Sequence, residues 1–568
     1  MRGYNAKKLF VLLLRWLYFS RGSFLPRRYL VRRLFVLALL PAFAFLIAAK
    51  AQQPIPSNGP SDDPHTSRPG ALYTIHNNVA LVVLDGVALD QKGRVVTDLK
   101  ASDFQIKEDG APQSIRNFDS AGKYTPAPTV NINSTAELDQ FAPHAPVNIV
   151  LLDEVSTRFE DMAYARWSLK KWLDAQPAHL DTPTMLIAVS LERFQVLRDY
   201  TQDKDEILNA LNKRFVDYPW HLNQAGWNGD SYEAAHLALR RVAEATSSHH
   251  GPKTMIWLGR GFPSARSGHH STNVQAGADT VTSHTLDELR DARVTLYTID
   301  PAGILVNPEE AYPTSGWNYW PFGGDPRFEA IAVATGGRAF ANRNDVDVAI
   351  GSSIRDGSSV YTLTYIPPDL DKDPKKLRHI QVVVNRPDVH FITRTAYFPE
   401  SRPGHLNKDG SVSNRLGLSV MSAAESNMQY DGVRFTATIS PTDPSTIHIH
   451  VDNRGIGYWI PNDESKPRHT RIIMVATTLD KAGKEVNRQG ENYNFSMVDT
   501  SRTSPFNIPL DWDFKLDNIS KATHLRIVLR VEVNGHMGTV DLPLTTGATA
   551  SSAPEVAVTA PIPTSSTP

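Results

Sequence analysis

The centre of the chain alternates short, almost wholly apolar runs with longer stretches of helical periodicity. The apolar runs predict strands that are buried on both faces, at residues 147–152 (VNIVLL), 185–189 (MLIAV), 255–258 (MIWL) and 294–299 (VTLYTI). Helices are expected between them, at 159–172, 203–214, 231–246, 286–292 and 327–334. Strands that alternate with helices predict an α/β domain with a mostly parallel sheet, which we place at residues 146–398.

Shorter alternating strands flank this central domain on both sides. Residues 73–120 hold short apolar runs joined by Asp/Gly turns at 90–94 and 108–110, which predicts a small β-sandwich-like domain. The strand patterns at 360–365 and 380–384 are expected to extend the β content of the central domain to residue 398. Further alternating runs predict an all-β sandwich over 416–545, for example at 435–439, 447–451 and 525–533.

Four segments have no periodic pattern of apolar residues, and their composition is typical of linkers and disordered segments. We interpret them as a disordered leader (52–72), a linker (121–145), a connector (399–415) and a disordered tail (546–568).

The N-terminus has the three parts of a secretory signal. Four arginines at 27, 28, 32 and 33 precede the apolar run 34–49, and Ala49-Lys50-Ala51 provides a small-x-small cleavage site. This pattern predicts a signal peptide at 1–51 and an exported protein, which is periplasmic, on the cell surface or secreted. An uncleaved signal that acts as an N-terminal membrane anchor remains the alternative.

Removing that signal changes the charge of the protein. Residues 1–51 hold ten of the 59 Lys and Arg and no acid, so 49 bases face 60 acids in the remainder, a formal charge of −11. A negative surface argues against nucleic acid as a partner, because phosphate binding needs a basic face. The chain has no cysteine, which excludes disulfides, thiolate nucleophiles and cysteine metal sites.

Six short segments occur together in a characteristic order and spacing: 90–99 (DQKGRVVTDL), 103–110 (DFQIKEDG), 151–153 (LLD), 257–263 (WLGRGFP), 334–338 (ATGGR) and 361–368 (YTLTYIPP). On these segments the chain resembles the VWFA-related family of acidobacterial type over residues 75–400. The resemblance implies a von Willebrand factor A-like, Rossmann-like central domain and a binding role. It supplies no ligand.

The resemblance also implies where a divalent ion would sit. In the metal-binding members of this fold, the first strand ends in Asp-x-Ser-x-Ser, a later loop supplies a Thr, and an Asp follows the fourth strand. Asp153 matches the first Asp and Thr157 keeps a hydroxyl, but Val155 has no oxygen and Gly259 replaces the second Asp. We therefore expect a degenerate, weak metal site at Asp153 and Thr157, and no cofactor.

Two alternatives bear on that expectation. Glu154, Asp161 or Asp230 could rescue magnesium binding with another carboxylate. Without a metal, Asp153 is expected to cap the following helix or to pair with Arg260.

Ligands of open α/β sheets gather at the carboxyl ends of the strands. The predicted ligand-binding face therefore comprises Ser156, Thr157, Gly259, Arg260 and Phe262, together with the loop aromatics Trp317 and Trp320. These residues favour non-catalytic recognition of a protein or cell-surface ligand. An exported hydrolase with an unrecognised site and a structural part of an envelope assembly are the alternatives. His448 and His450 share one face of a predicted strand and could chelate a metal, although a solvated strand face explains them more simply.

Overall fold

The computed structural model describes residues 81–124, 131–191, 193–216, 227–262, 272–304, 328–368, 376–399, 414–453, 456–458, 467–497 and 509–552. The predicted signal peptide and leader fall outside these ranges, as do Trp317 and Trp320. Those expectations therefore stay predictions. None of the helices in the described ranges is long and apolar enough to cross a membrane.

The central domain is a mixed α/β unit around a six-stranded sheet. Its strand order is β10-β9-β8-β5-β6-β7, in which all neighbours are parallel except β6 and β7. The strands are β5 (Val147–Asp153), β6 (His179–Val189), β7 (Phe194–Asp203), β8 (Lys253–Leu258), β9 (Val294–Ile299) and β10 (Ala339–Phe340). The mainly apolar strands β5 and β8 are buried at every position, as expected for strands covered on both faces.

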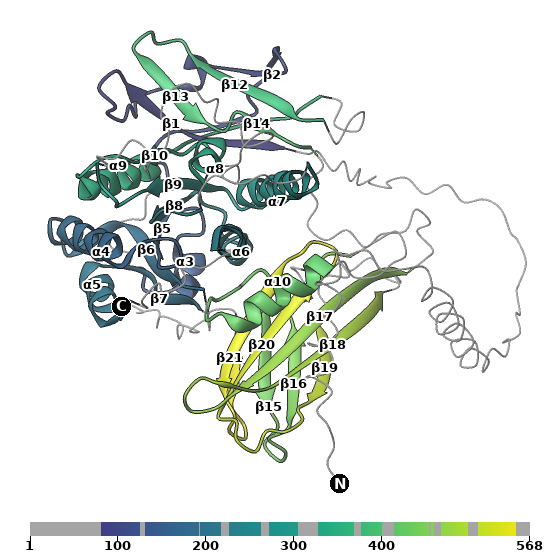
Figure 1. Ribbon diagram of the computed structural model, residues 1–568. Helices are drawn as coiled ribbons and strands as arrows, with labels where there is room; N and C mark the ends of the chain where they lie inside the picture. Colours follow the sequence, from purple (N-terminus) through teal and green to yellow (C-terminus); the bar gives the residue numbers. More distant parts are fainter. Residues whose placement is uncertain are drawn as a thin grey trace, which may run out of the picture. The chain divides into compact units, whose positions relative to one another are not determined.

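Helices cover both faces of this sheet (Figure 1). One face carries α4 (Phe159–Asp174), α5 (Lys204–Lys213) and α9 (Val346–Ser358), which pack on alternate β5 residues such as Val150 and Leu152. The other face packs on Ile149 and Leu151 and carries α3 (Thr135–Phe141), α6 (Trp227–Ala245), α7 (Thr272–Asp291) and α8 (Phe328–Ala334).

Helix α3 lies within the segment that we expected to be a linker. Its first turn is capped by Ser134, whose hydroxyl accepts a hydrogen bond from the backbone N–H of Glu137 (3.2 Å). Leu138 then anchors the helix in the core of the α/β domain. A seven-residue helix with one buried side chain leaves too little periodicity in the sequence to be recognised.

The N-terminal strands do not form a domain by themselves. They combine with the strands of 361–397, which we had placed in the central domain, into two four-stranded sheets of orders β13-β1-β11-β4 and β14-β12-β2-β3. We call this unit the β module. Its strands are β1 (Val82–Asp90), β2 (Phe104–Glu108), β3 (Ala111–Gln113), β4 (Asn117–Asp119), β11 (Tyr361–Tyr365), β12 (Arg378–Val384), β13 (Val389–Thr393) and β14 (Ala396–Tyr397), and the short helix η2 (Ala101–Asp103) precedes β2.

The physical reason for this correction is strand pairing across a long sequence separation. β1 pairs antiparallel with both β11 and β13, and β2 pairs with β12. Tyr361 of β11 also joins the two halves of the module, because its hydroxyl contacts the segment between β1 and η2. The hydroxyl donates to the carbonyl of Val96 (3.0 Å) and accepts from the N–H of Leu99 (3.1 Å). The α/β domain is therefore inserted between the two halves of the β module.

An ion pair joins the inserted domain to the β module. Arg293 precedes β9, and its guanidinium donates to both carboxylate oxygens of Asp85 on β1 (2.9 and 2.6 Å). Burial raises the pKa of Asp85, but the charge and hydrogen bonds of Arg293 outweigh it, so the pKa lies below its ordinary value. The pair is bidentate and largely buried, which makes its geometry specific.

The C-terminal region is a two-sheet antiparallel sandwich with one unexpected helix. Its sheets have the orders β19-β16-β15-β22 and β18-β17-β20-β21. The elements are α10 (Asn414–Glu425), β15 (Phe435–Ile439), β16 (Thr446–Val451), β17 (Arg468–Leu479), β18 (Glu485–Met497), β19 (Leu510–Lys515), β20 (His524–Val531), β21 (Met537–Pro543) and β22 (Thr549–Ser551).

Two features differ from the all-β expectation. Helix α10 buries Val420 and Ala423 in one apolar cluster with Val475 and Val528, which are strand residues of β17 and β20. Strand β22 falls in the expected disordered tail, where it pairs with β15 and closes the edge of its sheet. Its small polar residues carry no apolar period that would mark a strand.

Candidate functional site

The strand order of the central sheet reverses between β5 and β8, whose carboxyl ends therefore lie side by side. Asp153 ends β5, Gly259 and Arg260 follow β8, and Asp300 follows β9. Such a reversal point is where doubly wound sheets receive their ligands, because the flanking loops diverge there and leave a crevice.

Asp153 is fully buried, and its carboxylate is enclosed by four N–H donors. Oδ1 accepts from the backbone N–H of Val155 (3.0 Å) and of Ser156 (2.9 Å). Oδ2 accepts from the backbone N–H of Gly261 (2.8 Å) and from the indole Nε1–H of Trp257 (3.1 Å). A carboxylate offers about four lone-pair directions, so these donors occupy its full capacity.

Burial is the main influence on the ionisation of Asp153. It raises the pKa of the carboxyl to about 6, while the surrounding N–H donors act in the opposite direction. At neutral pH the group is therefore mainly ionised, and its charge is held by hydrogen bonds that tie β5 to the loop after β8.

Gly259 closes the space beside Asp153. It adopts φ +151°, and an added Cβ would lie 2.3 Å from Asp153 Cβ and 2.6 Å from Thr157 Oγ1. Thr157 is itself buried, and its Oγ1 accepts from the backbone N–H of Arg260 (3.1 Å). No aspartate side chain could be accommodated at position 259 without displacing both neighbours.

These residues do not fit a magnesium ion. Asp153 has no spare acceptor direction, the Thr157 oxygen is engaged by the backbone, and Val155 supplies no oxygen. Magnesium requires near-octahedral coordination by oxygen, and a single carboxylate whose acceptor positions are all taken by N–H donors does not provide it. Within the described ranges, no three acidic or histidine side chains are placed to hold an ion.

The sequence suggests three carboxylates as substitute metal ligands: those of Glu154, Asp161 and Asp230. Glu154 is buried and forms an ion pair with Arg214 (2.5 Å). The side chain of Asp230 lies outside the described part of the chain. Asp161, in the first turn of α4, lies in the electrostatic field of Arg260.

Arg260 pairs with Asp300 rather than with Asp153. Its Nε lies 3.6 Å from Asp300 Oδ2, and both side chains are partly exposed. Burial raises the pKa of Asp161, while the charge of Arg260 lowers it and that of Asp300 raises it. The edge thus presents one guanidinium that interacts electrostatically with two carboxylates. The sequence offered one signal for Asp300, its position directly after the apolar run of β9.

Phe262 does not belong to an exposed face. Its ring is buried and packs against His236 and Phe328 (both 5.3 Å between centroids) and against Tyr232 (4.7 Å). Gly261 allows this because its φ of +65° brings the backbone against the Phe328 ring, where a Cβ would lie only 2.2 Å away. Phe262 is therefore a core residue.

Among the described residues of the predicted face, Arg260 is the one that reaches solvent appreciably. Ser156, Thr157, Gly259 and Phe262 are all buried. The structure brings these five described residues together, but mainly as packed support for the edge rather than as a contact surface.

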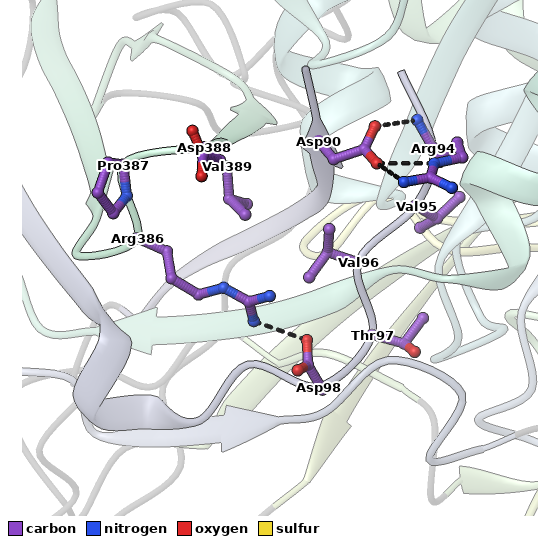
Figure 2. Close-up of a pocket in the computed structure, with 10 residues that line it drawn as sticks. All are labelled: Asp90, Arg94, Val95, Val96, Thr97, Asp98, Arg386, Pro387, Asp388 and Val389. Carbon is purple, nitrogen blue, oxygen red and sulfur yellow. Dashed lines mark hydrogen bonds and ion pairs between the residues drawn. The ribbon is translucent and has the colours of Figure 1, made fainter. Parts of the chain in front are cut away.

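A second candidate site is a hollow of about 510 Å³ in the β module (Figure 2). Two acid–arginine pairs flank it: Arg94 Nε donates to Asp90 (2.8 Å), and Arg386 donates to Asp98 (2.8 Å). Val96 lies between the two pairs in Figure 2, so an apolar patch separates them. The sequence did not indicate this hollow, because its two walls are almost 300 residues apart in the chain.

No family model and no curated protein matches this chain. Several solved structures show distant likeness, among them the following three. An aerotolerance-related membrane protein from Bacteroides fragilis is 12% identical, with 37% of this chain and 98% of that chain covered and a TM-score of 0.22. Proximal thread matrix protein 1 of the mussel byssus is 14% identical, with coverage of 37% and 48% and a TM-score of 0.23. The pilus adhesin SpaC from Lactobacillus rhamnosus is 9% identical, with coverage of 75% and 59% and a TM-score of 0.22. Likeness at these TM-scores carries no argument about fold or function.

Proposed function

We propose that this chain is an exported, non-catalytic binding protein whose central domain is of the von Willebrand factor A type. Numbered from β5, the sheet has the doubly wound order 3-2-1-4-5-6, and its third strand is the antiparallel one. This order and the motif resemblance over 75–400 both support the proposal. The signal-like pattern of residues 27–51 supports export, with an N-terminal membrane anchor if the signal is not cleaved.

We further propose that the domain recognises a protein or cell-surface ligand at its carboxyl edge without a metal ion. The observation that carries this proposal is the saturation of Asp153 by four N–H donors. In place of a bound cation, the edge offers the guanidinium of Arg260, which forms an ion pair with Asp300 and acts electrostatically on Asp161. A guanidinium can bind a ligand carboxylate through paired hydrogen bonds.

The β module provides a second candidate binding surface. Its hollow is lined by valines and by two guanidinium–carboxylate pairs, a mixture that suits a polar ligand with some apolar surface. The specific observation in its favour is that the hollow is a formed concavity, whereas the described residues of the carboxyl edge are closely packed.

Site-specific photo-crosslinking would distinguish the two surfaces. The crosslinker would replace Glu160 in the first turn of α4 at the edge, Thr97 in the wall of the hollow, or Lys521 in the C-terminal sandwich as an exposed control. Arg260 stays in place in all three variants. With envelope proteins of the source cells and EDTA present, we expect a defined product from position 160 and none from 521. A product from position 97 alone would favour the hollow.

Two other results would contradict the proposal. Loss of the product from position 160 in EDTA would show that a metal is required. Hydrolysis of peptide or ester substrates by the purified chain, abolished by Arg260→Ala, would favour the exported-hydrolase alternative.

A further inference from the structure

The exposed face of the sheet β19-β16-β15-β22 carries two histidine–aspartate pairs. Strand β16 alternates buried Ile447, Ile449 and Val451 with exposed His448 and His450. Strands β16 and β19 are neighbours in this sheet (Figure 1). Their antiparallel register sets His448 opposite Asp513 and His450 opposite Asp511. Nδ1 of His450 lies 2.6 Å from Asp511 Oδ1, and Nδ1 of His448 is hydrogen-bonded to Asp513 Oδ1.

These bonds determine which ring nitrogen can bind a metal. An ionised carboxylate accepts hydrogen bonds and does not donate them, so the hydrogen of each neutral imidazole sits on Nδ1. The lone pair is then on Nε2, the nitrogen away from the carboxylate. A carboxylate that orients a histidine in this way is the usual outer partner of a histidine metal ligand, because it fixes the tautomer and raises the basicity of the ring.

The surroundings leave both rings accessible. The side chains of His448 and His450 are 50% and 56% exposed. On the other side of β16, the register places Thr438 and Thr436 beside them, so the neighbouring strand brings no cation. In the described part of the chain, neither Nε2 atom has a hydrogen-bond partner.

The spacing suits a shared ion. Residues i and i+2 of a strand point to the same face about 7 Å apart, and exposed imidazoles can lean toward each other across that distance. Each Nε2 would lie about 2.0–2.1 Å from the metal, as in zinc–imidazole bonds.

We propose that His448 and His450 form a two-nitrogen surface site for a divalent transition metal of the Zn²⁺, Ni²⁺ or Cu²⁺ class. Imidazole favours these ions over Mg²⁺ and Ca²⁺, which prefer oxygen. Asp513 and Asp511 are positioning residues that orient the rings. The remaining coordination positions are open to water or to a ligand on another molecule. This site is independent of the proposed function of the α/β domain.

Isothermal titration of the purified chain with Zn²⁺ alone tests the proposal, with an excess of Mg²⁺ present throughout. We expect one Zn²⁺ per chain at this site, lost in the double variant His448→Gln/His450→Gln. Asp511→Asn with Asp513→Asn should weaken Zn²⁺ binding by about 10–100-fold while the histidines remain, as is typical when outer partners are removed.

His469→Gln is the matched control. His469 is an exposed strand histidine in the other sheet, and its Nδ1 meets the Ser496 hydroxyl (2.9 Å) instead of a carboxylate. Its replacement should leave Zn²⁺ binding unchanged. All the substituted side chains are exposed, and circular dichroism would verify folding. Absence of Zn²⁺ binding by the unaltered chain, or equal binding by the double histidine variant, would overturn the proposal.

Discussion

The substitution Gly259→Ala tests whether the space beside Asp153 is closed. The added methyl carbon would lie 2.3 Å from Asp153 Cβ and 2.6 Å from Thr157 Oγ1, far inside van der Waals contact. Overpacking of this kind costs about 1–3 kcal/mol, and the positive φ adds about 1 kcal/mol for a residue with a Cβ. We therefore expect the free energy of unfolding to fall by about 2–4 kcal/mol.

Hydrogen–deuterium exchange of the β5 and β8 amides, followed over a urea series, would measure this loss in the α/β domain itself. Gly93→Ala is the control, because Gly93 has φ +72° but no atom within 4 Å of an added Cβ. It should cost only the backbone contribution, about 1 kcal/mol, measured on the amides of β1. If Gly259→Ala destabilises its domain no more than Gly93→Ala does, the packing argument is refuted. Gly259→Asp should likewise fail to create magnesium binding.

Two further predictions concern buried charges and pH. Asp85→Asn should destabilise the chain by about 3–5 kcal/mol at pH 7 by leaving Arg293 without its carboxylate. The pKa of Asp85 is lowered in the folded state, so the contribution of its carboxylate to the free energy of unfolding should disappear as the pH falls below 4. Equal urea-denaturation midpoints for the unaltered chain and Asp85→Asn at pH 7 would contradict the prediction. Burial lowers the pKa of His236 to about 3 in the folded chain. Between pH 6.5 and 3, the His236 imidazole is therefore protonated in the unfolded chain but stays neutral in the folded chain. This difference should lower the free energy of unfolding by about 4–5 kcal/mol between pH 6.5 and 3. His236→Phe should flatten that part of a urea-denaturation pH profile, and an unchanged slope would count against it.

The parts of the fold that the sequence predicted best are those with a local signal. The strands β5, β8 and β9 are mainly apolar because helices cover both faces of the sheet, so each is recognisable within six or seven residues. The N-cap Asp203 likewise marks the start of α5, where its side chain accepts from Asp205 N (2.8 Å).

The parts that it could not predict depend on partners distant in the chain. Nothing in the YTLTY segment of β11 indicates that it pairs with β1, about 275 residues earlier, rather than with the central sheet. In the candidate site, the sequence identified Asp153 and the loss of the second aspartate. It could not show that the indole of Trp257 and the N–H of Gly261 would donate to the Asp153 carboxylate, since the first depends on the pairing of β5 with β8 and the second on the loop after β8. The prediction that Phe262 lies on the ligand-binding face was wrong, because the conformation of the same loop buries its ring.

Calorimetric titration with Mg²⁺ is the most direct test of the central claim that the N–H donors around Asp153 leave no place for an ion. The unaltered chain and Asp153→Ala would be titrated side by side at neutral pH. We predict no stoichiometric Mg²⁺ binding to either protein. Tight binding of one Mg²⁺ by the unaltered chain, lost in Asp153→Ala, would contradict the account.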